Sequence, residues 1–186
     1  ADAVVNCVGI LGEVGPNKFD TVQHEGAERI ARLAAAAKIP ALVHLSAIGA
    51  DEDSDSDYLR TKALGEAGVL EHFPCAIILR PSIIFGTEDQ FFNRFASMTR
   101  MSPILPIAGG ATKFQPVYVD DVATAVVKGV LGQAEGGVYE LGGPEVADFR
   151  SLMQNMLGVI QRKRIVLNLP FFAARLLAGG FDLAQT

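Results

Sequence analysis

The sequence predicts an α/β protein built around a mainly parallel sheet, with a small second lobe. Short and almost continuously apolar runs alternate with segments of helical periodicity, which is typical of strands covered by helices on both faces. Each of the first three apolar runs is followed by a loop containing glycine, serine or proline, where parallel sheets bind their ligands. A chain of 186 residues, 49% of them hydrophobic, can bury one sizeable core.

The first half of the chain contains three of these strands and two helices. In order, we expect a strand at 3–9, a helix at 19–37, a strand at 41–46, a helix at 57–71 and a strand at 75–80. Val22, Ala27, Ile30 and Ala34 repeat with the spacing of one helix face, and Asp20 can cap the helix that they define. Strand, helix and strand therefore alternate as they do in a parallel sheet.

The second half adds further elements and the small lobe. In order, they are a helix at 91–98, a break at 103–106, a strand at 114–119, a helix from 120 to about 131, a strand at 138–141 and a helix at 149–161. We expect the strand at 114–119 to be the fourth parallel strand. Residues 1–85 and 113–132 would form the main domain, and residues 86–112 and 133–186 the small lobe.

Two apolar segments of the small lobe have more than one interpretation. Phe91, Phe92, Phe95 and Met98 form a bulky stripe on one helix, which favours core packing first and the lining of a ligand cavity second. Residues 169–178 are apolar with a single cation. This tail can pack on the core, dock onto a partner or lie at a membrane surface.

Composition excludes several classes of function. The net charge of −5 and the pI near 5.2 argue against nucleic-acid binding, and the basic cluster 162–164 is expected to be a solvated helix end. No apolar run is long enough to span a bilayer. Cys7 and Cys75 lie in strand-like runs and are expected to be reduced, buried thiols.

Metal binding finds no support in the spacing of the possible ligands. The three histidines are scattered, and no zinc pattern exists. The acidic loop 51–57 suggests calcium, but it has no glycine at its sixth position and no glutamate at its twelfth. A solvated loop before the next helix is the better interpretation.

Tyr58 and Lys62, four residues apart, are the residues that point most clearly to chemistry. On a helix both side chains rise from one face, where the lysine ammonium can favour the phenolate and lower the pKa of the tyrosine. Ser46, at the end of the preceding apolar run, can hydrogen-bond a substrate oxygen. Together these groups can handle the proton in a hydride-transfer reaction, and the lysine can also reach a ribose hydroxyl.

These motifs resemble the short-chain dehydrogenase/reductase superfamily, in its extended, epimerase-like and atypical branches. A serine ends one strand, Tyr-x-x-x-Lys opens the next helix, Arg-Pro-Ser-Ile-Ile-Phe-Gly ends the third strand and Val-Tyr-Val-Asp-Asp-Val-Ala comes later, all in that family's order. The resemblance covers nearly the whole chain. It implies the C-terminal portion of a Rossmann domain, a doubly wound parallel sheet, followed by a small lobe.

The resemblance also implies a set of functional residues. Ser46, Tyr58 and Lys62 match the catalytic positions. The bound cofactor is expected to be NAD or NADP, in either redox state, with contacts from Val8, Gly9, Ser46, Tyr58, Lys62, Pro81, Ser82 and Ile83. No metal is expected.

A narrower resemblance is to the NAD(P)H-binding accessory subunits of respiratory complex I, subunit nine of the alpha subcomplex, and their bacterial relatives. It rests on Phe85 to Met98, the Pro103-Ile104-Leu105-Pro106 segment and Gln115 to Val119. It implies a tightly held structural nucleotide, complex I subunits as partners and a tail from Pro170 that docks near the membrane. The implied location is the bacterial cytoplasm, the cytoplasmic face of the inner membrane, or the mitochondrial matrix side.

The alternative is an active NAD(P)-dependent oxidoreductase, or a sugar-nucleotide epimerase or dehydratase, that uses Ser46, Tyr58 and Lys62. The chain departs from the extended pattern at Gln23-His24-Glu25-Gly26-Ala27, where Asn-Val-x-Gly-Thr is usual. It also lacks the glycine-rich strand-to-helix turn that cradles a pyrophosphate. We therefore expect an N-terminal βαβαβ half of roughly 60 to 80 residues upstream of Ala1, which would also decide between NAD and NADP.

Overall fold

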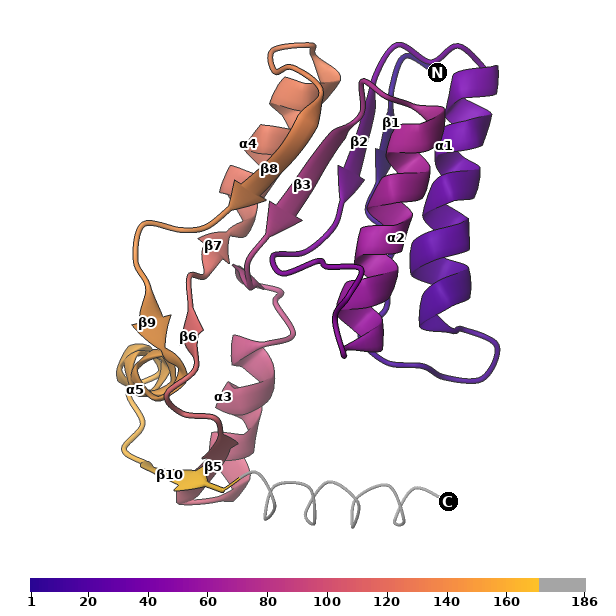
Figure 1. The fold of residues 1–186 in the computed structure, drawn as a ribbon. Coiled ribbons are helices and arrows are strands. Elements are labelled where there is room, and N and C mark those ends of the chain that lie inside the picture. The colour runs from indigo at the N-terminus through magenta and orange to yellow at the C-terminus, as the bar shows by residue number, and fades with distance from the viewer. Residues whose placement is uncertain (171–186) are drawn as a thin grey trace. The chain divides into compact units, whose positions relative to one another are not determined.

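The computed structural model describes residues 1–170, and their contacts divide into two compact units (Figure 1). The first unit comprises residues 1–82 and 117–142, and the second comprises residues 83–116 and the described residues from 143 onward. The predicted α/β fold with a parallel sheet is confirmed. The apolar tail beyond Pro170, to which we assigned docking, lies outside the described residues.

The first unit is built on a four-stranded parallel sheet. Its strands are β1 (Val4–Asn6), β2 (Leu42–Leu45), β3 (Ile77–Pro81) and β8 (Gly137–Leu141), in the order β1-β2-β3-β8. The prediction that residues 114–119 form the fourth strand is wrong, because β8 takes that place beside β3. Those residues instead contribute to two short strands, β6 (Lys113–Phe114) and β7 (Val117–Tyr118), separated by Pro116, which has no N–H to donate.

Helices cover both faces of this sheet. The π-helix η1 (Asp20–Glu25) runs into α1 (Gly26–Ala36), which packs beside α2 (Asp57–His72) on one face, and α4 (Val119–Val130) covers the other face (Figure 1). Successive residues of β2 point to opposite faces. Leu42 and Ile78 pack against α1 and α2, whereas Val43, Ile77 and Leu79 pack against α4.

The helix after β1 was predicted as one continuous α-helix, but its first six residues form a π-helix. The N–H of Gly26 donates to the carbonyl of Thr21, five residues back, and Gln23 is turned inward with 1% of its surface exposed. Gly65 of α2 faces this turn. A Cβ at Gly65 would overlap the Gln23 carbonyl oxygen, so only glycine allows the two helices to approach this closely.

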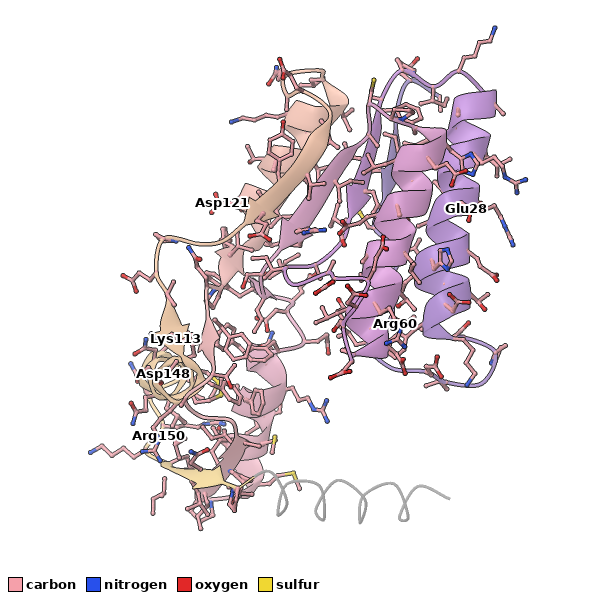
Figure 2. The ribbon with its side chains drawn as sticks, viewed as in Figure 1. Glu28, Arg60, Lys113, Asp121, Asp148 and Arg150 are labelled. Atoms are coloured by element: carbon pink, nitrogen blue, oxygen red, sulfur yellow. The ribbon has the colours of Figure 1, made fainter. Side chains whose placement is uncertain are left out.

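The second unit is smaller and mixed in structure. Its elements are β4 (Ile84–Phe85), α3 (Phe92–Met101), β5 (Ile104–Ala108), β6, β9 (Ala147–Asp148), α5 (Phe149–Val159) and β10 (Ile165–Leu169). β5 pairs with β10 in parallel, and β6 pairs antiparallel with β9, where Lys113 lies opposite Asp148. Figure 2 labels this pair together with Arg150, whose guanidinium donates to the carbonyl of Val166.

The core of the second unit is largely aromatic and aliphatic. Its buried members are Leu105, Ile107, Phe149, Met153, Met156 and Leu157, and Phe91, Phe92, Phe95 and Phe114 pack against them. Core packing, the first interpretation of the stripe, is therefore confirmed for Phe91, Phe92 and Phe95, but it is wrong for Met98, which is 38% exposed. The predicted break at 103–106 is wrong: β5 runs through Pro106, which pairs opposite Leu167 in a ribbon of only two strands.

Both cysteines are free thiols, but the prediction that they are buried is wrong. Cys7 and Cys75 are exposed, because β1 ends at Asn6 and β3 begins only at Ile77, so each thiol lies just beyond its strand. Within residues 1–170, no helix is long and apolar enough to cross a membrane. The same part of the chain contains no group of three or more His, Cys, Asp or Glu side chains that could hold a metal ion.

Candidate functional site

The candidate site lies in the first unit, where β1, β2 and β3 reach their carboxyl ends. Most of the residues proposed from the sequence come from this edge or from the first turns of α2: Val8 and Gly9 after β1, Ser46 after β2, Pro81 and Ser82 at the end of β3, and Tyr58 and Lys62 on α2. Ile83, the remaining predicted cofactor contact, is the first residue of the second unit.

Lys62 is buried beneath the loop that follows β1. Only 5% of its surface is exposed, and its Nζ donates to the carbonyl of Leu45 at 3.1 Å. A Cβ added at Gly9 would lie 3.1 Å from the same Nζ. Burial lowers the pKa of Lys62, while the nearby Glu66 and Cys7 act in the opposite direction.

Tyr58 lies one turn before Lys62 and rises from the same face of α2. Its ring packs edge-on against Phe19, with a centroid distance of 5.9 Å. The expectation that Lys62 lowers the pKa of Tyr58 is wrong for this structure: burial raises the pKa of the phenol. The reason is that desolvation disfavours the phenolate, while the Lys62 ammonium donates to the Leu45 carbonyl.

Ser46 offers an unused hydroxyl at the end of β2. Its N–H donates to the carbonyl of Leu79 at 2.7 Å, which ties the end of β2 to β3. The residue is 6% exposed, and its Oγ has no hydrogen-bond partner among the described residues. Since buried hydroxyls are normally paired, this oxygen is available to a ligand.

Asn6 and His44 are a buried, hydrogen-bonded pair on β1 and β2, next to the candidate site. The sequence did not predict this pair. Asn6 Oδ1 accepts from the N–H of Val8 at 3.1 Å, so its Nδ2 is the atom that donates to His44 Nδ1 at 3.0 Å. His44 therefore carries its proton on Nε2. Burial, and then the charge of Lys62, lower the pKa of His44 to about 4. The imidazole is thus neutral at pH 7.

Gln23 is the second residue that pattern reasoning undervalued. Its Nε2 donates to Thr61 Oγ1 at 3.1 Å, and Thr61 Oγ1 in turn donates to the carbonyl of Asp57. Its Oε1 is buried without a partner in the described part of the chain and would lie 3.5 Å from a Cβ at Gly9. The side chain that replaces the usual asparagine therefore points into the site.

These residues fit one end of a nicotinamide dinucleotide. The main chain at Gly9 lies close to the polar ends of Lys62 and Gln23, and Ser46 presents a buried hydroxyl with no partner among the described residues. An ammonium and a phenol on one helix face are suitable partners for ribose hydroxyls. For the pyrophosphate, the described residues contain no glycine-rich turn that opens a helix after a strand.

No protein-family model matches the chain. Several curated relatives are named NADH dehydrogenase (ubiquinone) 1 alpha subcomplex subunit 9, mitochondrial, among them proteins from Arabidopsis thaliana and Mus musculus. The Arabidopsis thaliana protein is 38% identical over 186 residues, covering 98% of this chain and 46% of the relative. The Mus musculus protein is 35% identical over 175 residues, covering 92% and 46%. The chain thus spans about half the length of these relatives.

A third relative is a ceramide reductase from Caulobacter vibrioides, which is 28% identical over 127 residues and matches 68% of this chain and 40% of its own length. Among solved structures, UDP-glucuronic acid 4-epimerase from Bacillus cereus in complex with NAD has a TM-score of 0.78 at 19% identity, covering 91% of this chain and 63% of the epimerase. Bacillus anthracis dTDP-4-dehydrorhamnose reductase with NADP has a TM-score of 0.75 at 16% identity, with coverages of 91% and 66%. At these identities the two structures establish the shared fold alone.

Proposed function

The chain is homologous to alpha subcomplex subunit 9 of mitochondrial NADH dehydrogenase, and from this premise we propose that it is part of a complex I accessory or assembly subunit. In this proposal the protein holds a nicotinamide dinucleotide, NAD or NADP, as a structural clamp. Its partners are other complex I subunits and the adjoining membrane surface. The proposed location is the matrix side in a mitochondrion and the cytoplasmic side in a bacterium.

The observation that carries the nucleotide proposal is the close approach of Lys62 and Gln23 to Gly9. Both side chains are at least 95% buried, and both would contact any side chain at that position. Because Gly9 has no Cβ, these two polar side chains can lie against the main chain just beyond β1, at the sheet edge where parallel sheets bind their ligands. Ser46 Oγ, also buried and unpaired, faces no competing partner among the described residues.

Each residue has a specific role in this proposal. Lys62 and Tyr58 would hydrogen-bond the nicotinamide ribose, and Ser46 would hold the nicotinamide end. His44, neutral and fixed by Asn6, adds no second positive charge beside Lys62. Gln23 would hold the start of α2 through Thr61. A bound dinucleotide can supply hydride chemistry, but a structural clamp does not use it.

Nucleotide retention tests the proposal on the full-length protein. We expect Gly9→Val to reduce the dinucleotide that co-purifies, measured by chromatography after denaturation, by at least about tenfold, since the new side chain meets Lys62 and Gln23. Gly12→Val is the matched control, because a side chain at Gly12 meets nothing within 4 Å. Equal retention in both variants, or no nucleotide in the unaltered protein, would contradict the proposal.

The second candidate function is an active NAD(P)-dependent reductase or epimerase. It is favoured by the unpaired Ser46 hydroxyl, which is suited to a substrate oxygen, and by the similarity to a ceramide reductase. Tyr58 would give its proton to the substrate oxygen, Ser46 would polarise that oxygen, and Lys62 would stabilise the resulting phenolate.

Tyr58→Phe separates the two candidate functions, because it removes the acidic proton and keeps the ring against Phe19. The structural proposal predicts unchanged nucleotide retention to within about threefold, and unchanged assembly of complex I in cells that depend on this protein. If the unaltered protein instead turns over a carbonyl substrate with NAD(P)H and Tyr58→Phe abolishes turnover, the enzyme is the correct description.

A further inference from the structure

The second unit contains a cavity that the dinucleotide site does not use. Its volume is about 490 Å³, which is within the range of small-molecule sites. The apolar part of its wall includes Phe85, Phe92, Ala96, Leu152, Met156 and Ile160. All residues that line the cavity belong to the second unit. The site can therefore be considered without reference to the first unit.

Two of the polar side chains on its wall are already engaged. Asp89 accepts hydrogen bonds from the N–H groups of Phe92 and Gly86, and Asn93 Nδ2 donates to the carbonyls of Thr87 and Asp89. These bonds fix the start of α3. Glu145 and Asn155 are the other polar residues of the lining, and both are exposed. The interior of the cavity is thus lined by apolar side chains, and Glu145 and Asn155 lie at its solvent-exposed side.

The charges of the lining exclude an anionic head group. Among residues 1–170, no Lys, Arg or His lines the cavity, whereas Asp89 and Glu145 contribute two carboxylates. A diphosphate or a free carboxylate would be repelled by these groups and would find no cation to pair with. An uncharged head group could accept or donate a hydrogen bond at Asn155.

We propose that this cavity binds the long hydrocarbon chain of a lipid with an uncharged polar head. The chain would lie against Phe92, Leu152 and Met156, and the head would lie at the solvent side beside Glu145 and Asn155. This inference goes beyond the proposed function, because it assigns a second ligand to the second unit and requires no dinucleotide.

The test uses three probes on the full-length protein, which compete with the neutral dye N-phenyl-1-naphthylamine: hexadecanol, palmitate and UDP-glucose. We expect hexadecanol to displace the dye with a Kd at least about tenfold below that of palmitate, because only the head group differs. UDP-glucose should not displace the dye. Displacement by UDP-glucose, or a preference for palmitate over hexadecanol, would overturn the proposal.

Two variants locate the site. Ala96→Trp fills the cavity and should weaken hexadecanol binding at least about tenfold while nucleotide retention is unchanged, which separates this inference from the proposed function. Glu145→Lys, on the exposed rim, should bring the palmitate and hexadecanol affinities to within about threefold of each other. Glu135→Lys, an exposed change in the first unit, is the control. If Glu145→Lys behaves like its control, the assigned site is wrong, even where Ala96→Trp fails to fold.

Discussion

The two units bury different kinds of side chain. Of the buried polar or charged residues in the described part of the chain, seven lie in the first unit: Asn6, Gln23, His44, Ser46, Thr61, Lys62 and Glu66. The second unit buries only Thr99 among its described residues, and it gathers its phenylalanines into one cluster instead. Buried polar groups cost free energy unless they are paired, and Gln23 Oε1, His44 Nε2 and Ser46 Oγ in the first unit have no partner among the described residues, which supports the proposed ligand site in that unit.

Charge separates the two units in the same way. The first unit carries eight Lys and Arg against sixteen Asp and Glu, a net charge of −8. The second unit carries seven Lys and Arg against four Asp and Glu within residues 83–116 and 143–170, a net charge of +3. The overall charge of −5 is therefore the sum of two units whose net charges have opposite signs, and such units attract different partners.

The largest effect is expected in the aromatic core of the second unit. Phe149→Ala should destabilise the protein by about 4 kcal/mol, because Phe149 packs against the rings of Phe91, Phe95 and Phe114. Phe19→Ala in the first unit removes one edge-on contact with Tyr58 and should cost about 1 kcal/mol. Urea denaturation measures both. If Phe149→Ala and Phe19→Ala reduced the free energy of unfolding equally, the aromatic cluster would not give the second unit additional stability.

A smaller effect is expected where helices of the first unit meet. Gly65→Ala should cost about 3 kcal/mol, because the new methyl group overlaps the Gln23 carbonyl and forces η1 away from α2. Gly158→Ala in α5 has open space around it and should stabilise the second unit by about 0.5 to 1 kcal/mol. The melting temperatures of the two variants should therefore move in opposite directions. A neutral Gly65→Ala would show that the two helices do not meet so closely.

The smallest expected effect is the change in the free energy of unfolding per pH unit that His44 causes. Its pKa is about 4 in the folded protein against 6.5 for an ordinary histidine, so the folded state favours the neutral ring. The associated stability is complete above pH 6.5 and is lost as the pH falls toward 4, by up to about 1.4 kcal/mol per pH unit. His44→Gln should flatten this slope in denaturation measured between pH 7 and 4.5. An unchanged slope would assign the acid sensitivity to other groups.

The fold could be predicted because buried parallel strands have a simple signature. β1, β2 and β3 are apolar on both faces, so their positions follow from the sequence alone. β8 was predicted as a strand at 138–141 but not as the fourth strand of this sheet: its residues alternate less clearly, and Val138 and Tyr139 are 45% and 39% exposed at the sheet edge. Likewise, β5 and β10 pair although their partner residues lie 61 positions apart in the chain, which no local pattern indicates.

The candidate site was predictable only in part. Ser46, Tyr58 and Lys62 form a recognisable order along the chain, and they stay predictions as functional residues. Asn6 and His44 meet because β1 and β2 pair in a register that sets them opposite each other. Gln23 reaches Thr61 because a π-helix turns it inward. Register and helix type depend on tertiary contacts, so residue identity did not reveal these partners.

The π-helix also has a consequence for the evolution of this sequence. Its hydrogen bonds close over five residues, so η1 contains one residue more per turn than an α-helix of the same path. Deleting one residue between Asp20 and Glu25 would restore α-helical spacing and keep the residues on either side on the same helix faces, so only the widened turn that carries Gln23 would be lost. Gln23 owes its inward position to this wider turn as much as to its own chemistry. Homologues should therefore be compared at this point by length before they are compared by residue type.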